Sequence, residues 1–145
     1  MKEEKITGNM LWQSDLGNGK YRNPILYVNY SDPDVIRVGD TYYMTASSFN
    51  YMPGLPILTS RDLVNWKLVN YGVKRLPYEI YDKPAHAGGI WAPSLRYHNN
   101  KFLIYFGMPD EGIFMICAED PLKEWEPPLC VREGKGPWSW NLYIL

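Results

Sequence analysis

The sequence has no excess of charge of one sign and no long apolar run. Its 145 residues carry 15 Lys and Arg against 16 Asp and Glu, a net charge of −1. This balance excludes the strongly basic surface by which proteins bind nucleic acids or anionic membranes. The charged start, at residues 1–5, is followed by no apolar stretch as long as a signal peptide or a membrane span requires. We therefore expect a cytoplasmic protein, or a periplasmic or secreted one whose leader has been removed.

Cysteine and histidine are also scarce. Cys117 and Cys130 lie in or beside apolar runs and follow no metal-ligand or redox spacing. Buried thiols of this kind behave as small apolar side chains. We expect both thiols to be reduced and buried, and the sequence shows no ligand set for a metal and no sign of a cofactor.

Aromatic residues, in contrast, are abundant, at 15% of the chain. Flat rings pack well in sheets, and they also stack on the faces of sugars. From about residue 23, short apolar or alternating runs follow one another, separated by many of the 12 Gly and 12 Pro. No stretch keeps the three-and-four spacing of a long helix. These patterns predict an all-β fold.

An internal repeat sharpens this prediction. Residues 33–44 align with residues 93–104 at an offset of 60, from Pro33 to Pro93. Later in each unit, Trp66 and Trp125 recur at an offset of 59. Each unit reads as a hairpin, a third strand and a turn that ends in Trp, which is typical of a β-propeller blade. We expect an approach segment (1–22) and a partial propeller domain (23–145), with blade one at about 30–70, blade two at about 91–128 and a divergent tail at 137–145.

The number of blades indicates a fragment. Propellers close with roughly four to eight blades, whereas this sequence holds about two. Two blades leave open sheet edges, which favour aggregation or pairing with another chain. Self-association through these edges is therefore one expectation, and a complete small sandwich made of the two repeats is the alternative.

Two acids precede the first inner strand, which lines the central channel in a propeller. Asp32 and Asp34 flank Pro33. Glycoside hydrolysis generally needs two carboxyl groups, one on each side of the bond that breaks. Asp-Pro-Asp is also a common turn sequence. From the residues alone, a turn and a catalytic role both stay open.

Several short motifs stand in a fixed order along the chain. They are Asn-Pro-Ile-Leu at 23–26, Tyr-Ser-Asp-Pro-Asp at 30–34, Arg-Val-Gly-Asp-Thr-Tyr-Tyr-Met at 37–44, Ser-Ser-Phe at 47–49, Pro-Gly-Leu-Pro-Ile at 53–57, Ser-Arg-Asp-Leu-Val-Asn-Trp at 60–66 and Gly-Gly-Ile-Trp-Ala-Pro-Ser at 88–94. Their identity, order and spacing resemble the opening of glycoside hydrolase family 43. The resemblance runs from about Asn23 to Pro128.

This resemblance implies a five-bladed propeller with β-xylosidase or α-L-arabinofuranosidase activity, acting with inversion on xylo- or arabino-oligosaccharides. The general base of the family falls on Asp32. Asp34 takes a position where relatives often carry a small residue, so it receives no catalytic role. Phe49 and Trp91 match aromatic positions that wall the sugar site. Ala92 and His86 complete the expected substrate-binding set, although a loop histidine without a partner is more often incidental.

The end of the sequence departs from the family pattern. The family uses two further acids, an Asp that opens the third blade and a Glu general acid. At the corresponding place this sequence reads Trp-Ser-Trp-Asn, at 138–141. No residue is assigned to either acid, so we expect a truncated chain with little or no activity alone. The alternatives are a carbohydrate-binding half-propeller without catalysis and an assembly fragment that needs a partner chain. The choice between xylose and arabinose stays open.

Overall fold

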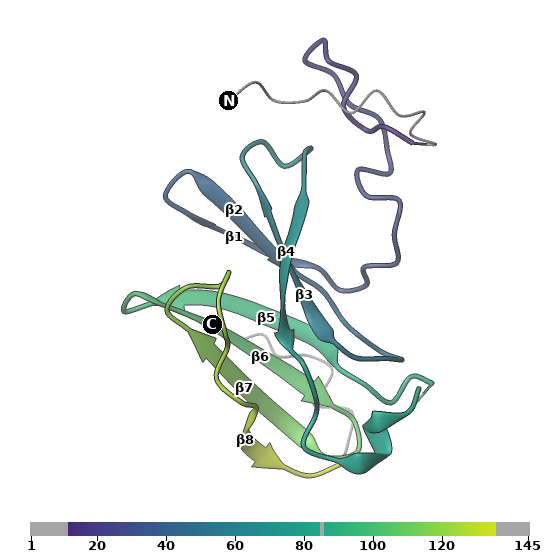
Figure 1. Ribbon diagram of the computed structural model, residues 1–145, viewed down its shortest axis with the longest axis vertical. Helices are drawn as coiled ribbons and strands as arrows, with labels where there is room; N and C mark the ends of the chain where they lie inside the picture. The colour runs from purple at the N-terminus through teal and green to yellow at the C-terminus, as the bar shows by residue number, and fades with distance from the viewer. Residues whose placement is uncertain (1–11, 85, 136–145) are drawn as a thin grey trace.

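Two four-stranded antiparallel sheets form the fold in the computed structural model, which describes residues 12–84 and 86–135 (Figure 1). Blade one consists, in spatial order, of β1 (Asp34–Val38), β2 (Thr41–Thr45), β3 (Gly54–Ser60) and β4 (Lys67–Val73). Blade two consists of β5 (Trp91–His98), β6 (Lys101–Met108), β7 (Gly112–Ala118) and β8 (Leu129–Glu133). A short 3₁₀ turn, η1 (Glu79–Asp82), lies in the connection between the blades. The prediction of an all-β chain with two propeller blades is confirmed.

The first hairpin of each blade has the turn residues that tight β-hairpins require. Gly39 joins β1 to β2 with φ of 59°, and Asn99 and Asn100 join β5 to β6 with φ of 48° and 60°. Positive φ at turn positions matches the twist of the two strands, and Gly and Asn adopt it most readily. The repeat in the sequence therefore reflects two hairpins of the same length, with positive φ at the first turn residue, Gly39, in one and at both Asn99 and Asn100 in the other.

The fourth strand of each blade begins after the repeated tryptophan. The Trp66 indole N–H donates a hydrogen bond to the Leu63 carbonyl at 2.9 Å, and the Trp125 indole N–H donates one to the Pro121 carbonyl at 3.2 Å. Each ring therefore closes the turn that precedes its strand. β4 ends at Val73 and β8 at Glu133, where the expected limits of the blades were about 70 and 128. The predicted tail at 137–145, and residues 1–11 of the approach segment, lie outside the described residues.

The main core lies between the two sheets. Phe106 and Phe114, on neighbouring strands of blade two, stack with their centroids 5.8 Å apart. Blade two contributes most of the buried side chains, and blade one adds a smaller set from β3 and β4. The cluster consists of Leu55, Ile57, Val73, Leu76, Tyr81, Ile90, Leu95, Phe102, Ile104, Phe106, Met108, Phe114, Ile116, Ala118 and Trp125.

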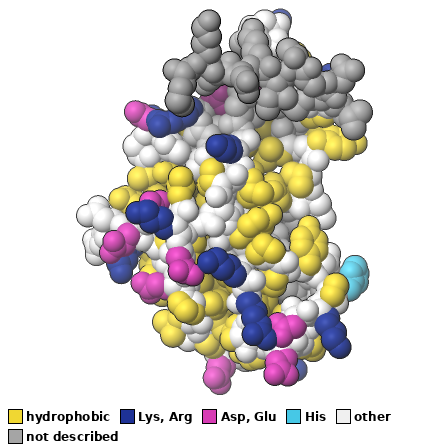
Figure 2. All heavy atoms as spheres, viewed as in Figure 1, with side chains coloured by type: hydrophobic (Ala, Val, Ile, Leu, Met, Phe, Trp, Pro, Cys, Tyr) yellow, Lys and Arg dark blue, Asp and Glu magenta, His cyan; other side chains and the backbone are white. Residues whose placement is uncertain are grey.

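The surface and the cysteines carry little chemistry of their own. Figure 2 shows basic and acidic side chains interspersed on the visible face, as the small net charge implies. Cys117 is buried and Cys130 half-buried, and neither forms a disulfide. Burial raises the pKa of the Cys117 thiol, which keeps it protonated at neutral pH. In the part of the chain that the structure describes, no helix is long and apolar enough to cross a membrane.

Candidate active site

Asp32 is exposed and lies just before β1, in a strained backbone conformation. Its φ is 47°, in the left-handed region that few residues other than Gly and Asn or Asp adopt. One carboxylate oxygen, Oδ2, accepts a hydrogen bond from the Ser47 hydroxyl at 2.8 Å. The other oxygen has no hydrogen-bond partner among the described residues. The site therefore presents a carboxylate held at one oxygen and open at the other.

Ser47 lies in the segment that follows β2 and is itself fixed on two sides. Its backbone N–H donates to the Ser31 carbonyl at 2.9 Å, beside Asp32. Its hydroxyl oxygen accepts a hydrogen bond from the Ala92 backbone N–H at 2.8 Å. Ala92 is the second residue of β5, so this serine connects the acid of blade one to the inner strand of blade two.

A short backbone bridge brings the two aromatic residues together. Ser48 and Ile90 exchange backbone hydrogen bonds of 2.9 and 2.8 Å, and the Gly89 N–H donates to the Phe49 carbonyl at 2.8 Å. A Cβ at Gly89 would lie 2.2 Å from the Ser48 carbonyl oxygen, so only glycine fits there. The bridge places the Phe49 and Trp91 rings with centroids 4.6 Å apart and planes inclined at 57°.

The loop before β5 supports this ring pair. The Trp91 indole N–H donates to the Ala87 carbonyl at 3.1 Å, and the Ala87 N–H donates to the Asn50 side-chain oxygen at 2.8 Å. His86 precedes Ala87 and is exposed, and it makes no hydrogen bond or ion pair within the described part of the chain. The structure thus brings Asp32, Phe49, Trp91 and Ala92 to one end of the blades, and among the described residues no hydrogen bond or ion pair links His86 to them.

Asp34 lies close to Asp32 in sequence but serves the packing of the two blades. One of its oxygens accepts hydrogen bonds from the Leu95 N–H at 2.8 Å and from the Arg96 guanidinium at 2.9 Å. The other accepts from the Val35 N–H at 3.0 Å. With its oxygens engaged by blade two and by its own backbone, Asp34, to which no catalytic role is assigned, joins the two blades.

Ser47 is the residue that sequence reasoning missed. It lies in the motif at 47–49, yet only Phe49 of that motif was expected in the site. Its partners are 15 and 45 residues away in the chain, and no local pattern predicts contacts at such separations. Asn50, which fixes the loop at Ala87, is 37 residues from its partner and was missed for the same reason.

A small cavity of about 190 Å³ lies on blade one, beside Ser47. Ser31, Ser47 and Phe49 line it together with three tyrosines, Tyr30, Tyr51 and Tyr71. Burial, with a smaller contribution from the other two phenols, raises the pKa of Tyr30. None of the described residues that line this cavity is an Asp, Glu, Lys, Arg or His, so this side of the site is aromatic and uncharged.

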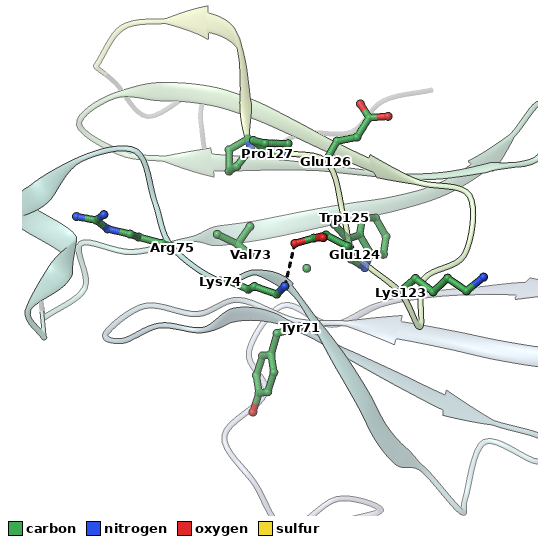
Figure 3. A pocket seen from close by; sticks show the side chains of 11 residues that line it. Tyr71, Val73, Lys74, Arg75, Lys123, Glu124, Trp125, Glu126 and Pro127 are labelled. Carbon is green, nitrogen blue, oxygen red and sulfur yellow. Dashed lines mark hydrogen bonds and ion pairs between the residues drawn. The ribbon is translucent and has the colours of Figure 1, made fainter.

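A second cavity, of about 230 Å³, lies at the junction of β4 with the segment that precedes β8 (Figure 3). An exposed ion pair crosses it, from Lys74 to Glu124 at 3.0 Å. The Asn70 amide nearby donates to the carbonyls of Pro121 and Lys123 at 3.1 and 2.6 Å. These contacts join β4 and the residue after it to the turn that precedes β8, and we interpret this cavity as a packing seam between the blades. Among residues 12–84 and 86–135, no three His, Cys, Asp or Glu side chains gather closely enough to hold a metal ion.

Where the two blade-like sheets meet, the site combines a held carboxylate with a pair of aromatic rings, which are groups that carbohydrate-active proteins use. Comparisons with known proteins agree. The family model for glycosyl hydrolases family 43 matches residues 21–141. A putative β-xylosidase of Xylanibacter ruminicola is 46% identical over 114 residues, which cover 78% of this chain and 21% of that protein. A non-reducing-end α-L-arabinofuranosidase of Bacteroides ovatus is 38% identical over 141 residues, which cover 92% of this chain and 25% of that protein.

The solved structures give the same result. The family 43 protein BlXynB of Bacillus licheniformis superimposes with a TM-score of 0.70 at 33% identity, over 80% of this chain and 25% of that one. The chain belongs to glycosyl hydrolase family 43. It spans about a fifth to a quarter of the length of these relatives.

Proposed function

We propose that this chain forms the front part of an inverting pentoside hydrolase in which Asp32 is the general base. The observation that carries the proposal is the carboxylate that Ser47 holds near the paired rings of Phe49 and Trp91. In an inverting glycosidase the base takes a proton from the water that attacks the sugar. The unpartnered oxygen of Asp32 is available to accept that proton.

The proposed substrate is a xylo- or arabino-oligosaccharide. Family 43 enzymes act on such glycans, and the relatives are named as xylosidases and arabinofuranosidases. The inclined rings of Phe49 and Trp91 offer an apolar wall for the C–H face of a pentose. Ala92 lies beside them at the start of β5, and we keep His86 as a candidate contact because its loop supports the Trp91 ring.

The 145-residue chain alone is expected to show little or no turnover. No residue is assigned to the general acid, and such an acid typically contributes about 10²–10⁴-fold in rate. Chromogenic β-xylosides and α-L-arabinofuranosides test this directly. Turnover by the purified chain that Asp32→Ala abolishes would show that the two blades suffice.

The function itself is tested in a chimera. Residues 21–141 replace the matching segment of the Bacteroides ovatus arabinofuranosidase, and both chromogenic pentosides are assayed with Asp32 intact and with Asp32→Ala. We expect turnover with Asp32 and a loss of about 10²–10⁴-fold without it. A folded chimera in which Asp32→Ala keeps full activity would contradict the proposal. The preferred substrate distinguishes xylose from arabinose.

A binding module without catalysis is the second candidate, because the ring pair is complete in this chain while only one acid is assigned. Titration calorimetry with xylo- and arabino-oligosaccharides distinguishes the two. Binding that Asp32→Asn leaves unchanged and Trp91→Ala abolishes favours the module.

Self-association of the chain alone is also proposed. The face of blade two opposite the core carries half-buried apolar side chains, among them Leu103, Tyr105, Ile113 and Met115. On β8, Leu129 and Val131 are 59% and 54% exposed. Uncovered apolar faces and free strand edges favour pairing with another chain. Light scattering is expected to give a mass well above 16.9 kDa, and a monomeric mass would contradict this proposal.

A further inference from the structure

The buried hydroxyl of Ser47 joins a carboxylate of one blade to a backbone amide of the other. We propose that Ser47 is a positioning residue, which orients Asp32 and makes that orientation depend on the docking of blade two. The inference rests on the proposed function, in which Asp32 is the general base. Ser47 is only 7% exposed, so water competes little for its two hydrogen bonds.

The chemistry of the three groups fixes the direction of this chain of hydrogen bonds. The Ala92 N–H can only donate, and an ionised carboxylate can only accept. Ser47 Oγ therefore accepts from Ala92 at 2.8 Å, and its own proton points to Asp32 Oδ2, also at 2.8 Å. Hydrogen bonds arranged in series polarise and strengthen one another. Protonation of Asp32 would weaken the bond at Ser47 and, through it, the bond at Ala92.

The backbone around Ser47 leaves the hydroxyl little freedom. The Ser47 N–H is bound to Ser31, next to Asp32, and the following residue, Ser48, is paired with Ile90 through two backbone hydrogen bonds. Asp32 and Ala92 have strained φ values of 47° and 38°. Both residues form a hydrogen bond with the Ser47 hydroxyl. Strain of this kind persists only where the surrounding contacts determine it. Ser47 supplies the side-chain contact at both positions.

A second acid two residues further along, at the start of β1, provides a matched control. Asp34 also crosses from blade one to blade two, but its carboxylate contacts the Leu95 N–H directly, at 2.8 Å, with no serine between them. A substitution at Ser47 should therefore change how the Ala92 amide responds to the charge of Asp32. It should leave the response of the Leu95 amide to the charge of Asp34 unchanged.

The test follows the backbone amide shifts of Ala92 and Leu95 by ¹H–¹⁵N NMR between acid and neutral pH, on the 145-residue chain. We expect the Ala92 amide to respond to the ionisation of Asp32, Ser47→Ala to abolish that response, and Ser47→Thr to retain it. The Leu95 response should be the same in all three proteins. An Ala92 response that survives Ser47→Ala would overturn the proposal.

A second variant keeps the test decisive if Ser47→Ala does not fold. Asp32→Asn, with Ser47 intact, should remove the pH response of Ala92 and preserve that of Leu95. If Ala92 still responds as before, Asp32 does not act on it and the positioning role is wrong.

Kinetics of the chimera separate this inference from the proposed function. Ser47→Ala should lower kcat about tenfold to a hundredfold with little change in KM, because a small misplacement of a reacting group has an effect of this size. Ser47→Thr should restore most of the rate. If Asp32→Ala abolishes activity while Ser47→Ala has no effect, the function stands and the positioning role fails. If Asp32 is dispensable while the NMR coupling is present, the proposed function fails and the structural coupling stands.

Discussion

The two blades share a topology, but they differ in how much of the core they provide and in which residues of the candidate site they carry. Blade two provides most of the fully buried large side chains, which are Leu95, Ile104, Phe106, Met108, Phe114 and Ile116, whereas blade one provides Leu55, Ile57, Val73 and Thr45. Blade one instead carries Asp32, Ser47 and Phe49. Its β1 alternates half-buried and exposed residues, with Val35 40% exposed.

This difference shows how a site can combine strain with stability. Asp32 is exposed and has an unfavourable backbone conformation, which the short strand β1 alone would not maintain. The well-packed β5 of blade two is linked to Asp32 by the hydrogen bonds of Ser47. The same strand donates a hydrogen bond to the neighbouring Asp34. Functional residues can thus occupy weakly packed, strained positions when a neighbouring, better packed element holds them.

The largest expected difference between the blades is in core packing. Ile104 of blade two is 0% exposed, whereas Ile36 of blade one is half-buried. We expect Ile104→Ala to lower the free energy of unfolding by about 3–4 kcal/mol, because a cavity adds to the lost transfer free energy. Ile36→Ala removes the same atoms and should cost about 1 kcal/mol. Chemical denaturation measures both, and equal losses would contradict the division between the blades.

A smaller effect is expected at the bridge between the blades. Gly89→Ala places a Cβ 2.2 Å from the Ser48 carbonyl oxygen, and such crowding costs about 1–3 kcal/mol. The control, Gly39→Ala, has open space but a φ of 59°, and costs about 1–2 kcal/mol through strain alone. Near-UV circular dichroism distinguishes the two variants, because it reports the environment of aromatic rings. Only Gly89→Ala should change the aromatic signal of the Phe49–Trp91 pair, and an unchanged signal would show that the bridge does not align the rings.

The connection between the blades predicts sensitivity to alkali. The Tyr81 hydroxyl donates a hydrogen bond of 2.8 Å to the Glu111 carboxylate. Burial and this hydrogen bond raise the pKa of Tyr81 well above the usual 10.0. A raised pKa stabilises the fold below the pKa of the unfolded chain, and that stability is lost as the pH rises above about 10. Tyr81→Phe should lower the free energy of unfolding by about 1 kcal/mol at pH 7. The variant should then lose less stability than the parent chain as the pH rises above about 10. Tyr27→Phe, at a ring that is 77% exposed, should change neither.

The smallest effect compares the turns before the two fourth strands. Asp62 of blade one accepts hydrogen bonds from the Asn65 side chain and the backbone amides of residues 64 and 65, which hold its pKa well below the usual 3.8. Asp120 of blade two accepts one from the Leu122 amide at 3.0 Å. The stability from Asp62 is present above pH 3.8 and is lost as the pH falls below it. Asp62→Asn should remove this loss of stability in acid and should lower the free energy of unfolding at neutral pH by less than about 1 kcal/mol. Asp120→Asn should leave the loss in acid unchanged, and chemical denaturation at acid and neutral pH measures both.

The fold was predictable because its signals are local. The repeated hairpins, with turns at Gly39 and at Asn99 and Asn100, and the repeated Trp66 and Trp125 identify two blades without any knowledge of distant contacts. The exact strand limits were not predictable, because the fourth strands depend on pairing with β3 and β7 rather than on their own residues.

The site was predictable only in part. The resemblance to the family indicated Asp32, Phe49, Trp91 and Ala92, and the structure brings these four together. An extended reading of Asp32 and Asp34 would have placed both on one side, but the φ of 47° at Asp32 separates their directions. The role of Ser47 depends on residues from two blades, and contacts of this kind arise only when the blades pack.

The most direct test of the account compares Asp32→Asn with Asp34→Asn in the active chimera, by kcat and thermal unfolding. The two acids are two positions apart, and we assign the chemistry to the first and the joining of the blades to the second. We expect Asp32→Asn to lower kcat about 10²–10⁴-fold with little change in stability. Asp34→Asn should lower stability by about 1 kcal/mol and leave kcat within about threefold, which is below 1 kcal/mol of barrier. A folded Asp34→Asn enzyme as inactive as Asp32→Asn, or an active Asp32→Asn enzyme, would contradict the account.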